Sequence, residues 1–287
     1  MLTACLQALE LALEGIEEPK ECVVVVNGSE REEYRGVAER FRWVDFQFHE
    51  AALPFSRAVE SGLAAVKHEW VYLLNSDMLV EKDTLREGLQ RRAPDIFAIG
   101  SQIFLQDPRR RRVETNLTEL RVTNGLVDTW DVAPGDPAAV QECVYAGGGS
   151  SLFQTALLRQ FVKHSGAYDP FYWEDVEWGV AARRLGFRTL FCGSSHVWHG
   201  YRKTVERYYS GSEIQRIFER NRTVFQLRNP DAGGTVRAVQ GVLALRTPGE
   251  VWNVFRAGDI LRARFRAAAT MSAGATPQAL YSADRVQ

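Results

Sequence analysis

Apolar positions alternate between two rhythms through the first 104 residues. Leu2, Leu6, Leu9 and Leu13 recur at helical spacing, so the chain opens inside an amphipathic helix. Short runs of strand character separate the helical segments, beginning with the β-branched run at 22–26. Strands that alternate with helices of about ten residues are typical of βαβ units. The pattern predicts helices at 2–13, 30–41, 55–66 and 84–92, and strands at 22–26, 43–48, 70–74 and 95–104.

The rhythm breaks after Phe104, and residues 113–142 contain short candidate strands without a clear helix. From Tyr201 onward the chain is helical in pattern and rich in arginine. We therefore expect an α/β domain at 1–200, built on one mainly parallel sheet flanked by helices, and a helical C-terminal extension at 201–287. The further elements expected in the domain are strands at 143–146 and 187–192 and helices at 155–163 and 175–185.

Composition excludes several classes of protein. The chain is 45% hydrophobic and 25% charged, as in ordinary globular domains, and its net charge of −1 gives no electrostatic preference for nucleic acid. The four cysteines form no CxxC pair, which fits a reducing compartment and indicates neither a zinc site nor a disulfide framework. Three triplets match a glycosylation pattern and are interpreted as chance matches: Asn27-Gly-Ser, Asn116-Leu-Thr and Asn221-Arg-Thr. No apolar stretch approaches the ~20 residues that span a bilayer, and no signal peptide opens the chain, so we expect a cytoplasmic protein.

Polar triplets follow two of the predicted strands: Asn27-Gly28-Ser29 and Asn75-Ser76-Asp77. Ligands of open α/β sheets bind beyond the carboxyl ends of the strands. A carboxylate in such a turn can hold a hard divalent cation that bridges a diphosphate. Both triplets are also good turn sequences, and from the residues alone the two interpretations have about even weight.

Aromatic and acidic residues are mixed in the segment 171–178, Phe-Tyr-Trp-Glu-Asp-Val-Glu-Trp, where a helix is expected to begin. Acids at a helix N-terminus are favoured by the helix dipole, which accounts for Glu174, Asp175 and Glu177 as charges. The helix dipole does not explain why these three acids lie beside Trp173. Aromatic faces next to carboxylates are typical of a sugar-binding site.

Val197-Trp198-His199 follows the last predicted strand. A lone histidine is more often structural than a ligand. Because the chain already has a candidate metal carboxylate, His199 is also a candidate metal ligand.

Taken in order, these motifs resemble the inverting family 2 glycosyltransferases, which have the GT-A fold. The pattern is most similar to bacterial rhamnosyltransferase- and galactofuranosyltransferase-like enzymes of cell-envelope polysaccharide. The resemblance runs from about Leu2 to Arg228. Its most specific part runs from Tyr168 to His199 and contains Trp-Glu-Asp-Val-Glu at 173–177, Ala-Arg-Arg-Leu-Gly-Phe-Arg at 182–188 and Val-Trp-His at 197–199. The run Phe-Glu-Arg-Asn-Arg at 218–222 matches the helix that follows.

The resemblance implies a nucleotide-sugar donor, a glycan or lipid-linked hydroxyl acceptor and a divalent metal, Mn²⁺ or Mg²⁺. Asp77 matches the last carboxylate of the DxD-like turn, and His199 matches a histidine that completes the metal site. Asp175 matches the catalytic base, with Glu174 as its competitor. Residues 1–200 are then a GT-A-like nucleotide-sugar- and acceptor-binding domain. The resemblance assigns donor binding to Asn27, Gly28, Ser29, Asn75, Ser76 and Asp77, and acceptor binding to Gly148, Trp173 and Glu174.

The sequence departs from the family pattern at three points. The family normally has an apolar strand before its first helix, whereas this chain starts within that helix. Val26 stands where the family has an acid, and Asn75 stands at the first acidic position of the DxD-like turn. A non-catalytic sugar- or partner-binding module that lost activity with its first strand therefore stays open as an alternative.

One further alternative concerns another class of function, and two basic segments could contact an acceptor or a membrane. A sugar nucleotidyltransferase would carry a glycine-rich phosphate loop after its first strand, and none is visible. The basic run Pro108–Arg112 could bind a phosphorylated acceptor, although such runs are more often solvated loops. The basic amphipathic pattern at 254–266 fits either a peripheral contact with the inner face of the membrane or a helix packed on the domain.

Overall fold

A computed structural model describes residues 1–105, 115–123, 126–200, 205 and 208–229 of the chain. It divides into two units: Met1–Glu119 with Asp131–Gly211, and Leu120–Trp130 with Ser212–Gln287. The expected boundary at residue 200 stays a prediction. The basic run at 109–112 and the segment 254–266 lie outside the described residues.

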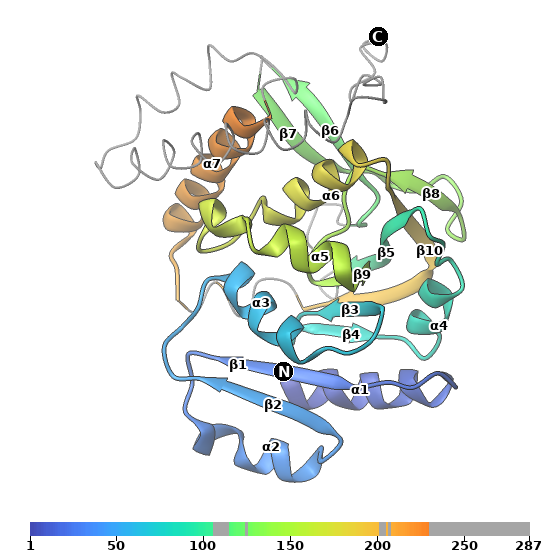
Figure 1. Cartoon of the computed structure of the whole chain (residues 1–287), viewed down its shortest axis with the longest axis vertical. Coiled ribbons are helices and arrows are strands. Elements are labelled where there is room, and N and C mark those ends of the chain that lie inside the picture. Colours follow the sequence, from blue (N-terminus) through green and yellow to red (C-terminus); the bar gives the residue numbers. More distant parts are fainter. Residues whose placement is uncertain (106–114, 124–125, 201–204, 206–207, 230–287) are drawn as a thin grey trace. The chain divides into compact units, whose positions relative to one another are not determined.

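The first unit has an α/β architecture, as the sequence predicts (Figure 1). The four strands predicted in the first 104 residues appear within one residue of their expected bounds. The strand expected at 143–146 is wrong, because β8 ends at Cys143 and the next strand begins at Ser150, and the strand expected at 187–192 continues to His199. The helices are α1 (Leu2–Glu14), α2 (Arg35–Arg40), α3 (Phe55–Ala65), α4 (Thr84–Leu89), α5 (Thr155–Val162) and α6 (Glu174–Arg184), with 3₁₀ turns at Arg31–Tyr34 and Ser165–Tyr168. The strands are β1 (Cys22–Asn27), β2 (Val44–His49), β3 (Trp70–Leu74), β4 (Met78–Val80), β5 (Ile96–Leu105), β8 (Val140–Cys143), β9 (Ser150–Gln154) and β10 (Arg188–His199).

The expectation that the first four predicted strands share one sheet is corrected by the strand pairing. β1 and β2 form a parallel two-stranded sheet, whereas β3 and β5 belong to a separate sheet with the order β3-β9-β5-β10-β4 and with β8 on β10. β5 and β10 are parallel, but β9 runs antiparallel between β3 and β5. Among the described strands, none connects β1 to β3, so the sheet is interrupted there.

Helices cover both faces of this interrupted sheet. On one face, α1 and α4 pack on Tyr72 and Leu74 of β3 in an apolar cluster with Val80 and Val197. On the other face, α3, α5 and α6 pack on Val71, Leu73, Phe97 and Phe153. Because neighbouring side chains of a strand point to opposite faces, β3 is covered on both sides. This explains why its sequence is a continuous apolar run.

The hairpin β6 (Thr118–Thr123) and β7 (Leu126–Asp131) and the helix α7 (Gly211–Arg228) lie mostly in the second unit, which takes Leu120–Trp130 of the hairpin and α7 from Ser212 onward. Gln226 of α7 accepts a hydrogen bond from the backbone N–H of Val127 (3.2 Å), and Arg222 lies 3.4 Å from Asp128. Beyond α7, the predicted helical extension lies outside the described residues.

Candidate functional site

The turn after β3 brings Asp77 to His199. The backbone N–H of Met78 donates to the carbonyl of Asn75 (3.0 Å), which closes the turn before β4. β4 then pairs antiparallel with β10, so that His199 lies opposite Met78. Asp77 Oδ2 is 3.6 Å from His199 Nε2, and both side chains are at most 10% exposed. His199 is the last residue of β10, not a residue that follows the strand as expected.

Asp77 and His199 fit two ligands of one divalent cation. A separation of 3.6 Å is too long for a hydrogen bond. Neighbouring ligands bound at ~2.1 Å to one ion lie about 3–4 Å apart. Among the described residues, no group of three or more His, Cys, Asp or Glu side chains is placed to hold a metal ion. Any ion held here would therefore need further ligands from a bound substrate or water.

The glycine run at 147–149 joins this turn to the start of α6. The backbone N–H of Asn75 donates to the carbonyl of Gly149 (2.9 Å), and the backbone N–H of Gly148 donates to Asp175 Oδ2 (3.2 Å). A Cβ at position 149 would lie only 2.5 Å from Nδ2 of Asn75. A larger residue at 149 would therefore have to displace the side chain of Asn75 from the glycine run.

Asp175 lies in the first turn of α6, with its carboxylate directed at Gly148. Its second oxygen accepts a hydrogen bond from the backbone N–H of Val176 (2.9 Å). Burial raises the pKa of Asp175 above its ordinary value, and the hydrogen bonds from Gly148 and Val176 oppose this rise. The group is thus an oriented carboxylate whose affinity for a proton is increased, as general bases require.

Glu174 differs from its neighbour in burial and partners. Its side chain is 5% exposed, and Oε2 has no hydrogen-bond partner among the described residues. Burial first, and then the charge of Asp175, raise the pKa of Glu174 well above its ordinary value. Glu174 is therefore poorly suited to accept a proton from an exposed hydroxyl unless the site rearranges.

The two residues before α6 have backbone conformations that side chains rarely adopt. Tyr172 has φ +76° and Trp173 has φ +77°, and neither is glycine. Such conformations are costly and are concentrated at functional sites. Trp173 is only 2% exposed, so its ring lies in the core, whereas Tyr172 is half-buried. Of the two rings, that of Tyr172 is the more accessible to a ligand.

The triplet after β1 has a structural task. The side-chain amide of Asn27 donates to the carbonyl of Leu53 (2.9 Å) and accepts from its backbone N–H (2.7 Å). Gly28 has φ +75°, and its backbone N–H donates to the carbonyl of His49 (2.8 Å). These bonds tie the end of β1 to the loop after β2, next to the half-buried Ser29. Donor binding by Asn27, Gly28 and Ser29 stays a prediction.

Asn116 is a site residue that sequence reasoning missed. It has φ +69°, its Oδ1 accepts a hydrogen bond from the backbone N–H of Gly147 (2.7 Å), and its Nδ2 donates to Ser151 Oγ (3.1 Å). Its own backbone N–H donates to Asp131 Oδ1 (2.9 Å). Asn116 thus fixes the position of the glycine run through the N–H of Gly147. The signal in the sequence was only an asparagine in an irregular segment, where asparagine tolerates the left-handed conformation.

Comparison with known proteins identifies the family. The sequence matches the family described as glycosyltransferase like family 2 over residues 2–223. The chain belongs to this family. No curated protein matches the sequence.

Two solved glycosyltransferase-like structures share the fold. GalNAc-T7, solved with UDP, GalNAc and Mn²⁺, matches with a TM-score of 0.52 and 16% identity over 74% of this chain and 44% of that chain. Residues 1–349 of S. aureus TarS, solved with UDP-GlcNAc, match with a TM-score of 0.52 and 14% identity over 84% of this chain and 65% of that chain. This chain thus spans less than two thirds of either structure. At these identities the likeness concerns the fold, which is a GT-A-like α/β fold.

The structure also bears on membrane association. None of the helices in the described part of the chain is both long and apolar enough to cross a bilayer.

Proposed function

We propose that this family member is an inverting, metal-assisted glycosyltransferase that moves a sugar from a nucleotide-sugar donor to a hydroxyl of a glycan, polysaccharide or lipid-linked acceptor. One observation carries the proposal. The glycine run at 147–149 touches Asp175 on one side and the turn of Asp77 on the other. A candidate base and a candidate diphosphate site therefore lie at either end of one short segment.

In the proposed reaction, the carboxylate of Asp175 takes the proton of the acceptor hydroxyl. The acceptor oxygen forms its bond to the anomeric carbon from the face opposite the diphosphate, while the bond from that carbon to the diphosphate oxygen breaks. The nucleoside diphosphate leaves with the bonding electrons, and the anomeric centre is inverted. Asp77 and His199 would hold a divalent cation, which supplies charge stabilisation for the leaving diphosphate.

The sequence left two alternatives open, an active transferase and a non-catalytic sugar-binding module. They are separated by measuring whether a nucleotide sugar binds and whether it is then turned over. Purified protein is screened by calorimetry against UDP-, GDP- and dTDP-sugars, with Mn²⁺, with Mg²⁺ and with a chelator. The proposal predicts metal-dependent binding of a nucleotide sugar, followed by release of the nucleoside diphosphate when hydroxyl acceptors are added. Binding without release across the acceptor panel would favour the non-catalytic sugar-binding module, and no binding of any nucleotide sugar would reject the transferase.

A further inference from the structure

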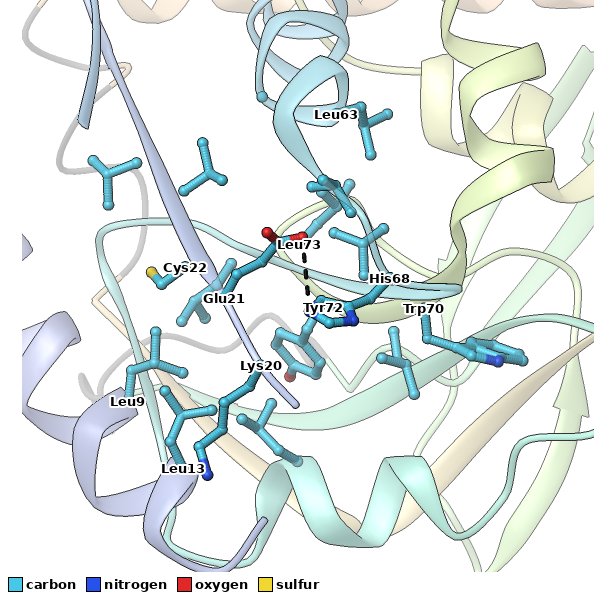
Figure 2. Close-up of a pocket in the computed structure, with 18 of the residues that line it drawn as sticks. Leu9, Leu13, Lys20, Glu21, Cys22, Leu63, His68, Trp70, Tyr72 and Leu73 are labelled. Carbon is cyan, nitrogen blue, oxygen red and sulfur yellow. Dashed lines mark ion pairs between the residues drawn. The ribbon is translucent and has the colours of Figure 1, made fainter. Parts of the chain in front are cut away.

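A cavity of about 640 Å³ interrupts the sheet between β1 and β3. Residues of both strands line it, Cys22–Val25 on one side and Trp70–Leu74 on the other (Figure 2). At ~30 Å³ per water molecule it has room for roughly 20 waters. We call this cavity the β1–β3 slot.

The walls of the slot are apolar and belong to the two helical layers. Leu2, Leu6 and Leu9 of α1 line it on one face, and Phe55, Val59 and Leu63 of α3 line it on the other. α1 also packs with Cys22 and Val24 of β1 and with Tyr72 and Leu74 of β3. The same helix therefore covers the same face of both strands, which places β1 and β3 in one layer with the slot between them.

α3 makes the matching arrangement on the opposite face. A Cβ at Gly62 of α3 would lie 3.0 Å from Cγ2 of Val25, so the helix approaches β1 closely. Leu63 of α3 packs in the cluster that includes Val71 and Leu73 of β3. The slot is thus closed above and below by helices and flanked on its sides by two strands.

The two flanking strands each have an unpaired edge. Within the described residues, β1 pairs with β2 on one side alone and β3 pairs with β9 on one side alone. Such edges present rows of backbone N–H and C=O groups, which need hydrogen-bond partners when they are shielded from water. An acyl chain could fill an apolar slot but could not satisfy these groups.

The ends of the slot differ. At one end, Glu21 accepts a hydrogen bond from the backbone N–H of Lys67 (2.6 Å) and lies 3.9 Å from His68 (Figure 2), and Glu18 pairs with Arg92. Asn75, Ser76 and Gly148 line the other end, which is where the candidate site begins. The slot therefore runs along the strands and opens at the candidate site.

We propose that the β1–β3 slot is the binding site for one extended, apolar peptide strand, which pairs with β1 on one side and with β3 on the other. β3 is five residues long, so a strand of about five residues, ~17 Å at ~3.3 Å per residue, matches it. Both faces of the inserted strand would be buried, so it must be a continuous run of residues such as Val and Ile, as in buried parallel strands. Its end would emerge beside Asn75 and Ser76.

The test uses a synthetic peptide, acetyl-Ser-Val-Val-Val-Ile-Ser-amide, and the full chain. Binding is measured by calorimetry and by amide hydrogen exchange of β1 and β3. The matched control peptide has proline at its two central positions, which keeps it apolar but removes N–H donors that pairing needs. We expect the first peptide to slow exchange of backbone amides in Cys22–Val25 and Trp70–Leu74, and the proline peptide to bind at least tenfold more weakly.

Two variants locate the binding. Ala58 of α3 lines the slot, whereas Ala64 on the same helix is exposed and does not. Ala58→Trp fills the slot and should abolish peptide binding, and Ala64→Trp should leave it unchanged. If Ala58→Trp fails to fold, the affinities of the two peptides for the unchanged chain still test the proposal.

Three outcomes would overturn the proposal. The first is equal binding of both peptides, and the second is binding of dodecanoate with no effect of the peptide. The third is a dimer, seen by light scattering, whose formation alone protects β1 and β3. A separate measurement, which rests on the proposed function, adds a nucleotide sugar to the peptide complex. Stronger donor binding with the peptide is expected there, and its failure would count against the proposed function and leave the strand site intact.

Discussion

Asp77 Oδ2 lies 3.6 Å from His199 Nε2, although 122 positions separate the two residues in the sequence. The short antiparallel pairing of β4 with β10 produces this approach, because it sets Met78 opposite His199. The backbone N–H of Gly200 also donates to the carbonyl of Asp77 (2.8 Å), so the turn and the end of β10 are fixed to each other. The carboxylate and the imidazole are therefore oriented before any ligand arrives.

Asp77→Ala removes one of the two proposed metal ligands. We expect Mn²⁺ to strengthen nucleotide-sugar binding in the unchanged protein and to have no such effect in the variant, as measured by calorimetry with and without the metal. Asp83→Ala is the matched control, because Asp83 is an exposed carboxylate at the start of α4. The same metal dependence in Asp77→Ala and in Asp83→Ala would remove Asp77 from the site.

Asp175→Asn keeps the size of the side chain but cannot take a proton. Loss of a positioned general base costs ~10²–10⁴-fold in rate. We expect turnover to fall by this range while donor affinity stays within a few-fold. Glu142→Gln, an exposed carboxyl on β8, is the control and should keep full turnover. Near-normal turnover of Asp175→Asn would reject Asp175 as the base.

The pH dependence of turnover offers an independent check on Asp175. Burial raises the pKa of this carboxyl, and only its ionised form can act as a base. The rate should therefore be low at acidic pH and rise through an apparent pKa above the ordinary carboxyl range. Because Glu174 lies beside Asp175 and also titrates, the measured value belongs to the pair. A rate that is flat from pH 4 to pH 8 would contradict a carboxylate base.

Asn116→Ala should destabilise the glycine run. The change removes the acceptor of the Gly147 N–H and places alanine at φ +69°. An unsatisfied buried hydrogen-bonding group costs ~1–3 kcal/mol, and the left-handed conformation adds ~1–2 kcal/mol. We expect a loss of about 2–5 kcal/mol in the free energy of unfolding, measured by urea denaturation. Asn116→Gly also removes the acceptor of the Gly147 N–H, but glycine adopts the left-handed conformation without cost. Its free energy of unfolding should therefore fall by less than that of Asn116→Ala. Equal decreases in the two variants would show that the conformation at 116 is not costly.

The elements of the first unit could be predicted because their hydrophobic periodicity is local. The run at 70–74 and the leucines of α1 carry their own signal. The pairing of strands was harder to predict, because β9 inserts between β3 and β5 from a distant part of the chain. A strand order depends on contacts between segments, and periodicity within one segment does not contain it.

The candidate site shows the same division. Asp77, Asp175 and His199 were named from motifs, and the structure brings Asp77 to His199 and directs Asp175 at Gly148. Asn116 carries no motif that indicates its structural role, since that role comes from a φ of +69° and from partners far along the chain. The burial of Trp173 could not be seen either, because an aromatic residue beside acids fits both a sugar platform and a core position.

Glu174→Gln separates the two acids at the start of α6. The folded protein holds the pKa of Glu174 well above its ordinary value of 4.5, mainly through burial. Below the ordinary value the side chain is protonated in both states and adds no penalty. As pH rises toward the raised pKa, the unfolded chain releases its proton first, and folding loses about 1.4 kcal/mol for each pH unit in this window.

Glutamine has the shape of the protonated acid and cannot ionise, so the variant should escape this loss. The stability of Glu174→Gln relative to the unchanged protein should therefore increase from pH 4 upward and level off above the raised pKa, as measured by urea denaturation across that range. Glu142→Gln is again the control, because an exposed carboxyl should give no such pH-dependent gain. Turnover of Glu174→Gln should stay within a few-fold of normal, since Asp175 keeps its bond to Gly148. A collapse of turnover as large as that of Asp175→Asn would instead make Glu174 the base. A stability difference between Glu174→Gln and the unchanged protein that is constant with pH would show that folding does not raise the pKa of Glu174.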